Sequence, residues 1–160
     1  MSQRLLQLAI HIRQELIDID YTLMRAMSGL EKARQNNDDL YLDGIALNLH
    51  GFYSGIERLF ERIAVHVDGL LPQGANWHHA LLMQMADEVL NVRPAVISEE
   101  VRQWLDDYRG FRHIVRNVYT YKFDPSRMER LTLNAPNLFD QLKKEMSAFA
   151  DFLESSIEDT

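Results

Sequence analysis

Residues 5–30, LLQLAIHIRQELIDIDYTLMRAMSGL, decide the fold class. Their apolar positions recur at alternating steps of four and three, a spacing that forms one stripe along a helix. The stripe consists of Leu5, Ala9, Ile12, Leu16, Ile19, Leu23, Ala26 and Leu30. We therefore predict a long helix over about residues 2–35. The polar run 36–39 ends it, and either aspartate in that run can cap the next helix.

A second stripe predicts another long helix over about residues 39–68. It consists of Leu42, Ile45, Leu49, Phe52, Ile56, Leu59, Ile63 and Val67. A row of glycines on the same helix, with Gly44 and Gly55 at its ends, indicates a close neighbour there. The stripes suit either the core of one chain or a dimer interface, and the sequence does not choose between them.

Further helices follow from capping and breaking signals. We expect them over about 77–90, from a Ser98 cap to about 121, in a short segment starting at Pro125, and over about 137–157, with a break at 134–137. No run alternates as a strand does. The fold class is therefore all-α, an up-down bundle of four main helices plus short extra helices, in one domain spanning 1–160.

Composition excludes several classes of protein. The chain has no cysteine, so disulfides, thiolate metal sites and a cysteine nucleophile are absent. The net charge of −7 argues against non-specific nucleic-acid binding. No apolar run approaches the ~20 residues of a membrane span, and the N-terminus lacks a signal-peptide layout. We expect a soluble, cytoplasmic protein that does not contact membranes.

The histidines show no metal-ligand spacing. Adjacent His78 and His79 diverge by about 100° on a helix. The pair His50 and Glu57 also lacks a pattern such as His-Glu-x-x-His. Neither a metal ion nor a cofactor is expected.

A basic segment lies on the helix predicted to end near 121. Residues 109–123 contain no acid, and their cations are Arg109, Arg112, Arg116 and Lys122. Arg112 and Arg116 are i,i+4 neighbours of like charge, which is mildly destabilising. A bound phosphate would relieve the repulsion, so we predict that Arg109 and Arg116 bind phosphate or RNA. The alternative is a solvated face that the flanking aspartates neutralise.

His113 and Asn117 lie on the same helix face as these arginines. A histidine beside guanidinium groups has the minimum equipment for metal-independent RNA cleavage, because it can take a proton while they hold the phosphate. The alternative is that His113 only hydrogen-bonds a neighbour. The opposite face, which includes Trp104 and Tyr119, is predicted to be core, with Tyr119 bordering the basic side.

Residues 111–124, FRHIVRNVYTYKFD, resemble the signature segment of HEPN domains, in the HepT-like group paired with minimal nucleotidyltransferases (MNT). Residues 50–62, HGFYSGIERLFER, resemble the second helix of this group. Residues 71–78 and 92–98 resemble its connecting segments. The resemblance covers about residues 40–155.

The resemblance implies a helical bundle that forms a homodimer and brings two copies of the motif together in a cleft. Active members cleave RNA without a metal. In the pairs formed with a minimal nucleotidyltransferase, the HEPN protein is the toxin and the nucleotidyltransferase is the antitoxin. The antitoxin neutralises the toxin by adding AMP to a tyrosine (AMPylation). Mapped onto this chain, the motif arginine is Arg112, its polar neighbour is His113 and the modified tyrosine is Tyr119.

One position departs from the motif. Asn117 stands where the motif has histidine, and asparagine is not a general base near neutral pH. Either His113 supplies the base, or the site acts by positioning alone, or the domain is an inactive homologue that serves as an RNA- or nucleotide-binding accessory subunit of a nucleotidyltransferase. Arg112 and Asn117 lie about 140° apart on a helix, so they are poorly placed to act together within one chain, whereas groups from two protomers could meet across a dimer. Beside the ribonuclease toxin and the accessory subunit, a plain helical scaffold whose basic face pairs with its own acids is a third interpretation.

Overall fold

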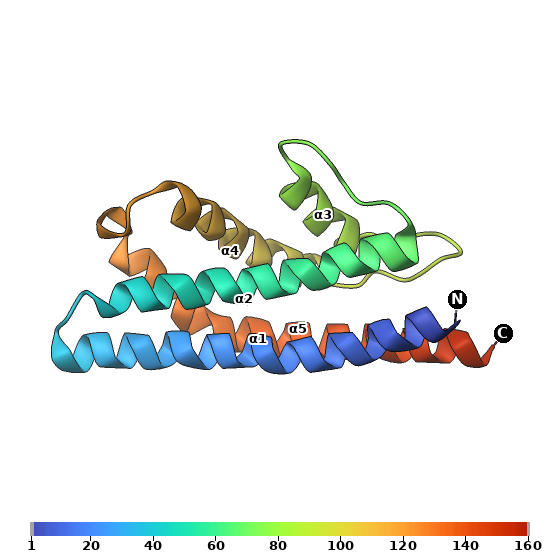
Figure 1. The fold of residues 1–160 in the computed structure, drawn as a ribbon, viewed down its shortest axis with the longest axis horizontal. Helices are drawn as coiled ribbons and strands as arrows, with labels where there is room; N and C mark the ends of the chain where they lie inside the picture. Colours follow the sequence, from blue (N-terminus) through green and yellow to red (C-terminus); the bar gives the residue numbers. More distant parts are fainter. Residues whose placement is uncertain (1, 160) are drawn as a thin grey trace.

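The computed structural model describes residues 2–159, which fold almost entirely into helices (Figure 1). The main helices are α1 (Ser2–Asn36), α2 (Tyr41–Ile63), α3 (Trp77–Ala86), α4 (Glu99–Asn117) and α5 (Pro125–Glu158). A π-helical turn, Ala64–Asp68, extends α2, and a 3-10 turn, Thr120–Lys122, follows α4. The all-α prediction is confirmed. None of the helices described has the length and apolar character needed to cross a bilayer.

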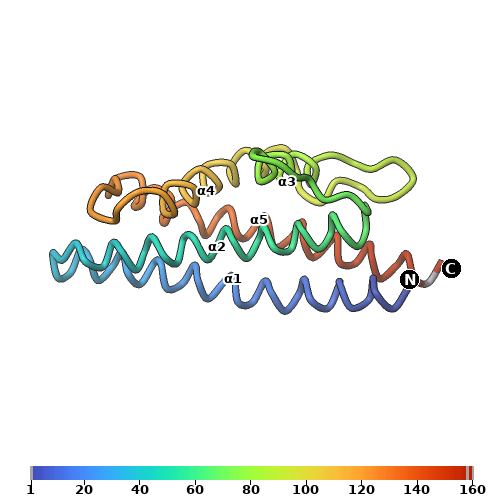
Figure 2. The backbone as a smooth tube through the Cα atoms, turned by 45° about the horizontal axis from the view of Figure 1, so that its top comes forward, coloured from blue at the N-terminus to red at the C-terminus, as the bar shows by residue number. Residues whose placement is uncertain are grey.

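The four longest helices run alternately up and down (Figure 1). α1 packs along both α2 and α5, and the three form a layer of long rods (Figure 2). α4 lies across α2 and α5 on the side away from α1, and α3 packs on α2 and α4. Because of this second layer, side chains of α2, α3 and α4 can contact one another.

The predicted stripe on α1 faces the core of its own chain. Every stripe residue is buried except Leu5, which is partly buried. A Cβ added at Gly55 of α2 would lie 2.9 Å from Cγ1 of Ile19, so the prediction of close packing is right there. At Gly44 it is wrong, because a Cβ there would meet nothing within 4 Å. The stripe thus needs no second chain to bury it, and another apolar row of α1, which includes Ile17 and Tyr21, stays exposed.

α4 begins as predicted and ends earlier. The Ser98 hydroxyl accepts a hydrogen bond from the backbone N–H of Val101 at 3.2 Å, as an N-cap does. The helix ends at Asn117, not near 121. The Asn117 side chain donates to the carbonyl of His113 at 2.7 Å, a local bond that competes with helix continuation. α3 likewise ends at Ala86, short of the predicted 90.

The predicted break at 134–137 is wrong, because α5 is one helix with Pro136 inside it. A proline there removes a backbone hydrogen bond and costs about 3 kcal/mol. Its neighbours in the helix are buried, namely Leu131, Thr132, Ala135, Leu138 and Phe139. Burial of each Leu or Phe contributes about 1.5–3 kcal/mol, so continuing the helix outweighs the cost. The Tyr108 hydroxyl also donates to the Leu131 carbonyl at 2.6 Å, just before the proline.

One buried arginine fixes the loops on either side of α3. Arg93 pairs with the carboxylate of Asp68, at 2.5 Å from Nε and 2.8 Å from Nη2. Its remaining N–H groups donate to backbone carbonyls of Gln84, Asp87 and Pro94. All five guanidinium donors are used. This anchor holds α3 against the end of α2 and determines where the residues of α3 lie.

Candidate functional site

Polar side chains meet where α2, α3 and α4 converge. On α2 they form one row at helical spacing, His50, Ser54, Glu57 and Glu61. Arg112 of α4 and His78 of α3 reach this row. We call Ser54, Glu57, His78 and Arg112 the polar junction.

Arg112 enters the polar junction through its Nε atom. Nε donates to the Ser54 hydroxyl at 3.3 Å and lies 3.9 Å from Oε1 of Glu57. The side chain is only 14% exposed. Among residues 2–159 its two Nη atoms have no acceptor, yet neither is sealed from solvent. Arg112 is therefore held at one end and keeps up to four N–H donors available to a ligand.

Glu57 links Arg112 to His78. Its side chain is 5% exposed, and Oε2 lies 2.8 Å from Nδ1 of His78. The His78 ring also lies against the Trp77 ring, with centroids 3.6 Å apart. A buried carboxylate requires partners of this kind, because its desolvation is costly. The repulsion between Arg112 and Arg116 that favoured a bound phosphate is thus partly offset by a carboxylate of the chain itself.

Two further groups on the α2 row have shifted pKa values. Burial, together with the charges of Arg112 and Arg116, lowers the pKa of His50 below its usual value. Burial and the nearby carboxylate of Glu57 raise the pKa of Glu61. Both shifts follow from crowding charged groups into a partly desolvated space.

His113 and Asn117 lie on the exposed side of α4. Besides its bond to the His113 carbonyl, the Asn117 amide lies 3.4 Å from Nδ1 of His113. Arg112 turns instead toward α2. Within one chain the structure therefore places His113 with Asn117 and leaves Arg112 with the α2 row.

The other two predicted phosphate-binding residues differ in their surroundings. Nε of Arg109 donates to Asp106 at 2.7 Å, and that carboxylate also lies 3.7 Å from His79. Arg116 is exposed and forms no ion pair with any described residue. Of these two arginines, Arg116 is the one with an uncompensated charge.

Tyr119 and Trp104 are not core residues as predicted. Tyr119 is 74% exposed, because α4 ends two residues before it and the chain there is extended. Its ring stacks on that of Tyr121, with centroids 6.1 Å apart. Trp104 is 39% exposed.

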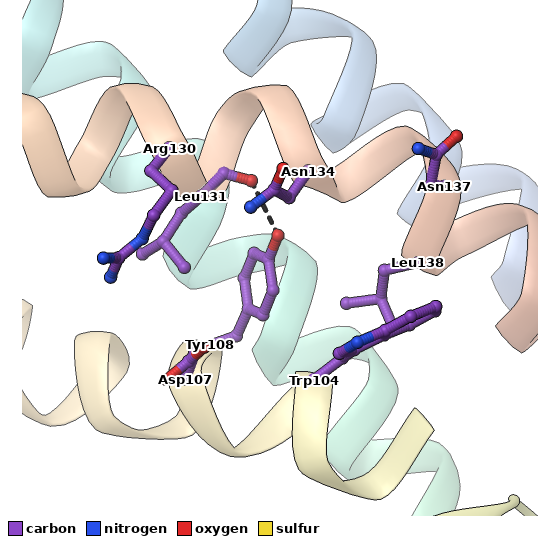
Figure 3. Close-up of a pocket in the computed structure, with 8 residues that line it drawn as sticks. All are labelled: Trp104, Asp107, Tyr108, Arg130, Leu131, Asn134, Asn137 and Leu138. Atoms are coloured by element: carbon purple, nitrogen blue, oxygen red, sulfur yellow. Dashed lines mark hydrogen bonds between the residues drawn. The ribbon is translucent and has the colours of Figure 1, made fainter. Parts of the chain in front are cut away.

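Trp104 lies at a cavity of about 300 Å³ between α4 and α5 (Figure 3). The cavity is lined by Trp104, Asp107, Tyr108, Arg130, Leu131, Asn134, Asn137 and Leu138. None of the site residues predicted from the sequence borders it. Over residues 2–159 no three His, Asp or Glu side chains are grouped to hold a metal ion.

Sequence reasoning missed most of the polar junction. His50, Glu57 and His78 were considered only as metal ligands and set aside, and Ser54 was not considered. The available signal was the row at i, i+4, i+7 and i+11 on α2, which places these polar groups on one face of that helix.

A comparison with protein families places this geometry in context. The family described as HepT-like protein matches residues 44–153, which is more than half of the chain and includes the whole polar junction. No curated protein and no solved structure matches.

Proposed function

The chain belongs to the HepT-like family, and from this premise we propose that it is the ribonuclease toxin of a HEPN/MNT toxin–antitoxin pair. The family match confirms the resemblance found in residues 111–124 and indicates a HEPN-type, toxin-related protein. The proposed activity is metal-independent cleavage of RNA. The proposed inhibitor is an MNT-type nucleotidyltransferase that adds AMP to Tyr119.

The observation that carries this proposal is the state of Arg112. Its guanidinium is oriented by Ser54 and Glu57 while its Nη atoms remain open to solvent. During cleavage the 2′-oxygen of a ribose attacks the adjacent phosphate, and negative charge grows on the phosphate oxygens. A guanidinium that is already oriented stabilises this charge without reorganising. Arg116, exposed one turn further along α4, adds a second cation.

We propose that two copies of the chain form the active cleft. Arg112 turns toward α2 while His113 and Asn117 lie on the outer side of α4, so these groups meet only if a second copy supplies one of them. Sedimentation of the purified protein tests this point. A dimer is expected, and a monomer that still cleaves RNA would contradict it.

Tyr119 is the proposed switch. Its exposed ring presents the hydroxyl to a partner enzyme just beyond the cationic end of α4. AMP attached there would add negative charge beside Arg116 and block entry of the RNA phosphate. Mass spectrometry after co-expression with a neighbouring nucleotidyltransferase should find AMP on Tyr119. The Tyr121→Phe variant should still be modified and Tyr119→Phe should not.

Asn117 favours a second candidate function, that of an RNA- or nucleotide-binding accessory subunit without catalysis. Its amide is bonded to the backbone of α4, and asparagine cannot exchange a proton as the motif histidine would. The Asn117→His variant separates the two candidates. Cleavage that appears only in this variant would support the accessory role.

The proposed function is tested by incubating the purified protein with single-stranded RNA in the presence of a chelator. Cleavage is expected, and binding should weaken as salt rises because phosphate contacts release counterions. No cleavage by wild type under any of these conditions would contradict the ribonuclease proposal. A lack of both RNA binding and nucleotide binding at low salt would also contradict the accessory role.

A further inference from the structure

Three helices each supply one group to a connected set, Arg112 from α4, Glu57 from α2 and His78 from α3. Glu57 lies between the other two, with one carboxylate oxygen 3.9 Å from Nε of Arg112 and the other 2.8 Å from Nδ1 of His78. The three residues are far apart in the sequence and meet only through the fold. A cation and an imidazole that share one buried carboxylate have the composition of an acid–base site.

The geometry of His78 leaves its second nitrogen free. Nδ1 faces the buried carboxylate, and the side chain is 25% exposed. Among residues 2–159 the Nε2 atom has no hydrogen-bond partner, yet it is not sealed from solvent. A carboxylate on Nδ1 fixes the ring and its tautomer, and it stabilises the imidazolium that forms when Nε2 takes a proton.

We propose that His78, held by Glu57, takes the proton from the 2′-hydroxyl of the RNA in the cleavage reaction proposed above. This inference rests on the proposed function. It assigns the base that Asn117 cannot supply to a residue outside the motif helix. Glu57 is then a positioning residue for both His78 and Arg112.

The step balances without any added reagent. Nε2 of His78 takes the 2′-hydroxyl proton, and the 2′-oxygen forms a bond to the adjacent phosphorus while the bond from phosphorus to the 5′-oxygen breaks. The 5′-oxygen gains a proton through water as the imidazolium returns to neutral. The products are a 2′,3′-cyclic phosphate and a 5′-hydroxyl. Arg112 donates to the phosphate oxygens throughout.

His78 is better suited to this role than the other two nearby histidines. His50 has a pKa lowered by burial and by the charges of Arg112 and Arg116, which makes it a weaker base. His113 lies on the outer side of α4, with its ring beside the Asn117 amide and no carboxylate to orient it. Only His78 shares a carboxylate with Arg112 among the described residues.

The test compares single-turnover RNA cleavage by His78→Asn and His79→Asn. Asparagine places an amide N–H near the position of Nδ1, so it can keep the bond to Glu57 without a titrating ring. We expect His78→Asn to cleave at least about 100-fold more slowly, as for loss of a general base, with unchanged RNA affinity and melting temperature. His79 is exposed on the same helix, so His79→Asn is the matched control. It should cleave RNA as fast as wild type does.

The pH profile adds a readout that a merely structural contact would not change. Glu57 pairs with His78, the charge of Glu61 on the same helix also interacts with it, and Arg112 of α4 lies beside Glu57. The pH profile of cleavage should therefore differ between wild type and His78→Asn, because the variant lacks the group proposed to take the proton.

The outcomes separate this inference from the proposed function. If wild type cleaves RNA and His78→Asn cleaves equally fast, the assignment of His78 is wrong and Glu57–His78 only joins α3 to α2. If wild type does not cleave, the proposed function falls and this inference falls with it. If His78→Asn has a lower melting temperature than wild type, a second variant is used. Added imidazole should restore RNA cleavage to His78→Ala, provided that this variant is folded. Failure of that rescue in a variant that still binds RNA would overturn the assignment.

Discussion

Arg93 and Arg112 each have a side chain largely withdrawn from solvent beside a buried carboxylate on another part of the fold, and their surroundings differ. Arg93 uses all five N–H donors on Asp68 and three backbone carbonyls, and its side chain is completely buried. Arg112 makes one hydrogen bond, to Ser54, with Glu57 at 3.9 Å, and its Nη atoms face solvent. Arg93 is saturated by the fold, whereas Arg112 is oriented by it.

This difference distinguishes a structural arginine from one that can bind a ligand. A buried guanidinium with every donor satisfied has nothing left to offer a ligand, and losing it leaves a carboxylate and carbonyls unpaired. A guanidinium held only at Nε has a fixed direction and unused donors, which suits bidentate recognition of a phosphate. The family match includes both residues, so it does not by itself tell them apart.

The largest expected effect on stability is at Arg93. Arg93→Ala should destabilise the protein by about 3–5 kcal/mol, because the buried Asp68 carboxylate loses its charged partner and keeps only the hydrogen bond from Gln84. Denaturant unfolding followed by circular dichroism measures this loss. A loss below about 1 kcal/mol would show that the anchor between α2, α3 and the following loop contributes little to stability. Arg93 would then not differ from Arg112 as a structural residue.

A smaller effect separates the paired and unpaired arginines of α4. Arg116→Ala should make RNA binding less salt-dependent, lowering the slope of log affinity against log salt by roughly 0.7, as for one phosphate contact on a single strand. Arg109→Ala should change the slope less, because Arg109 already pairs with Asp106. Titrations at several salt concentrations decide this, and equal effects from both variants would contradict the distinction.

The smallest expected effect is on the pH dependence of stability, and it arises at His50, close to Arg112. The pKa of His50 is lowered in the folded state from its usual value of 6.5. Below that value the unfolded chain binds a proton at this residue that the folded chain resists, so stability falls as pH falls through this window. His50→Gln should therefore lose less stability than wild type between pH 8 and pH 5. Melting temperatures across this range test it, and identical losses would contradict the shift.

The helices that bury one clean apolar stripe were the most predictable from sequence. The alternation of steps in residues 5–30 predicted α1 to within a residue, since burial of the stripe and the helical period agree. The break predicted at Pro136 is wrong because local chemistry favours a break there. The buried neighbours that allow α5 to continue through it depend on tertiary packing, which the local sequence does not show. α4 ends at Asn117, whose side chain bonds to the His113 carbonyl, and the apolar pattern of the segment does not predict this end.

The candidate site was predictable only on the motif helix. Arg112 stood out because its neighbours are basic, but the acid that faces it lies on another helix, and spacing along one helix cannot show that. Glu57 and His78 are 21 residues apart and meet because Arg93 fixes the loops around α3. Tyr119 was placed on the wrong face because the helix was extended past Asn117.

The central claim is that Arg112 serves a ligand and not the fold, and Arg112→Ala tests it when unfolding and RNA cleavage are measured on one preparation. Losing the hydrogen bond at Ser54 and the 3.9 Å contact with Glu57, which keeps His78, should cost less stability than Arg93→Ala does. Losing the guanidinium should slow cleavage at least about 100-fold. A variant that is as stable as expected and cleaves RNA as fast as wild type would contradict the account.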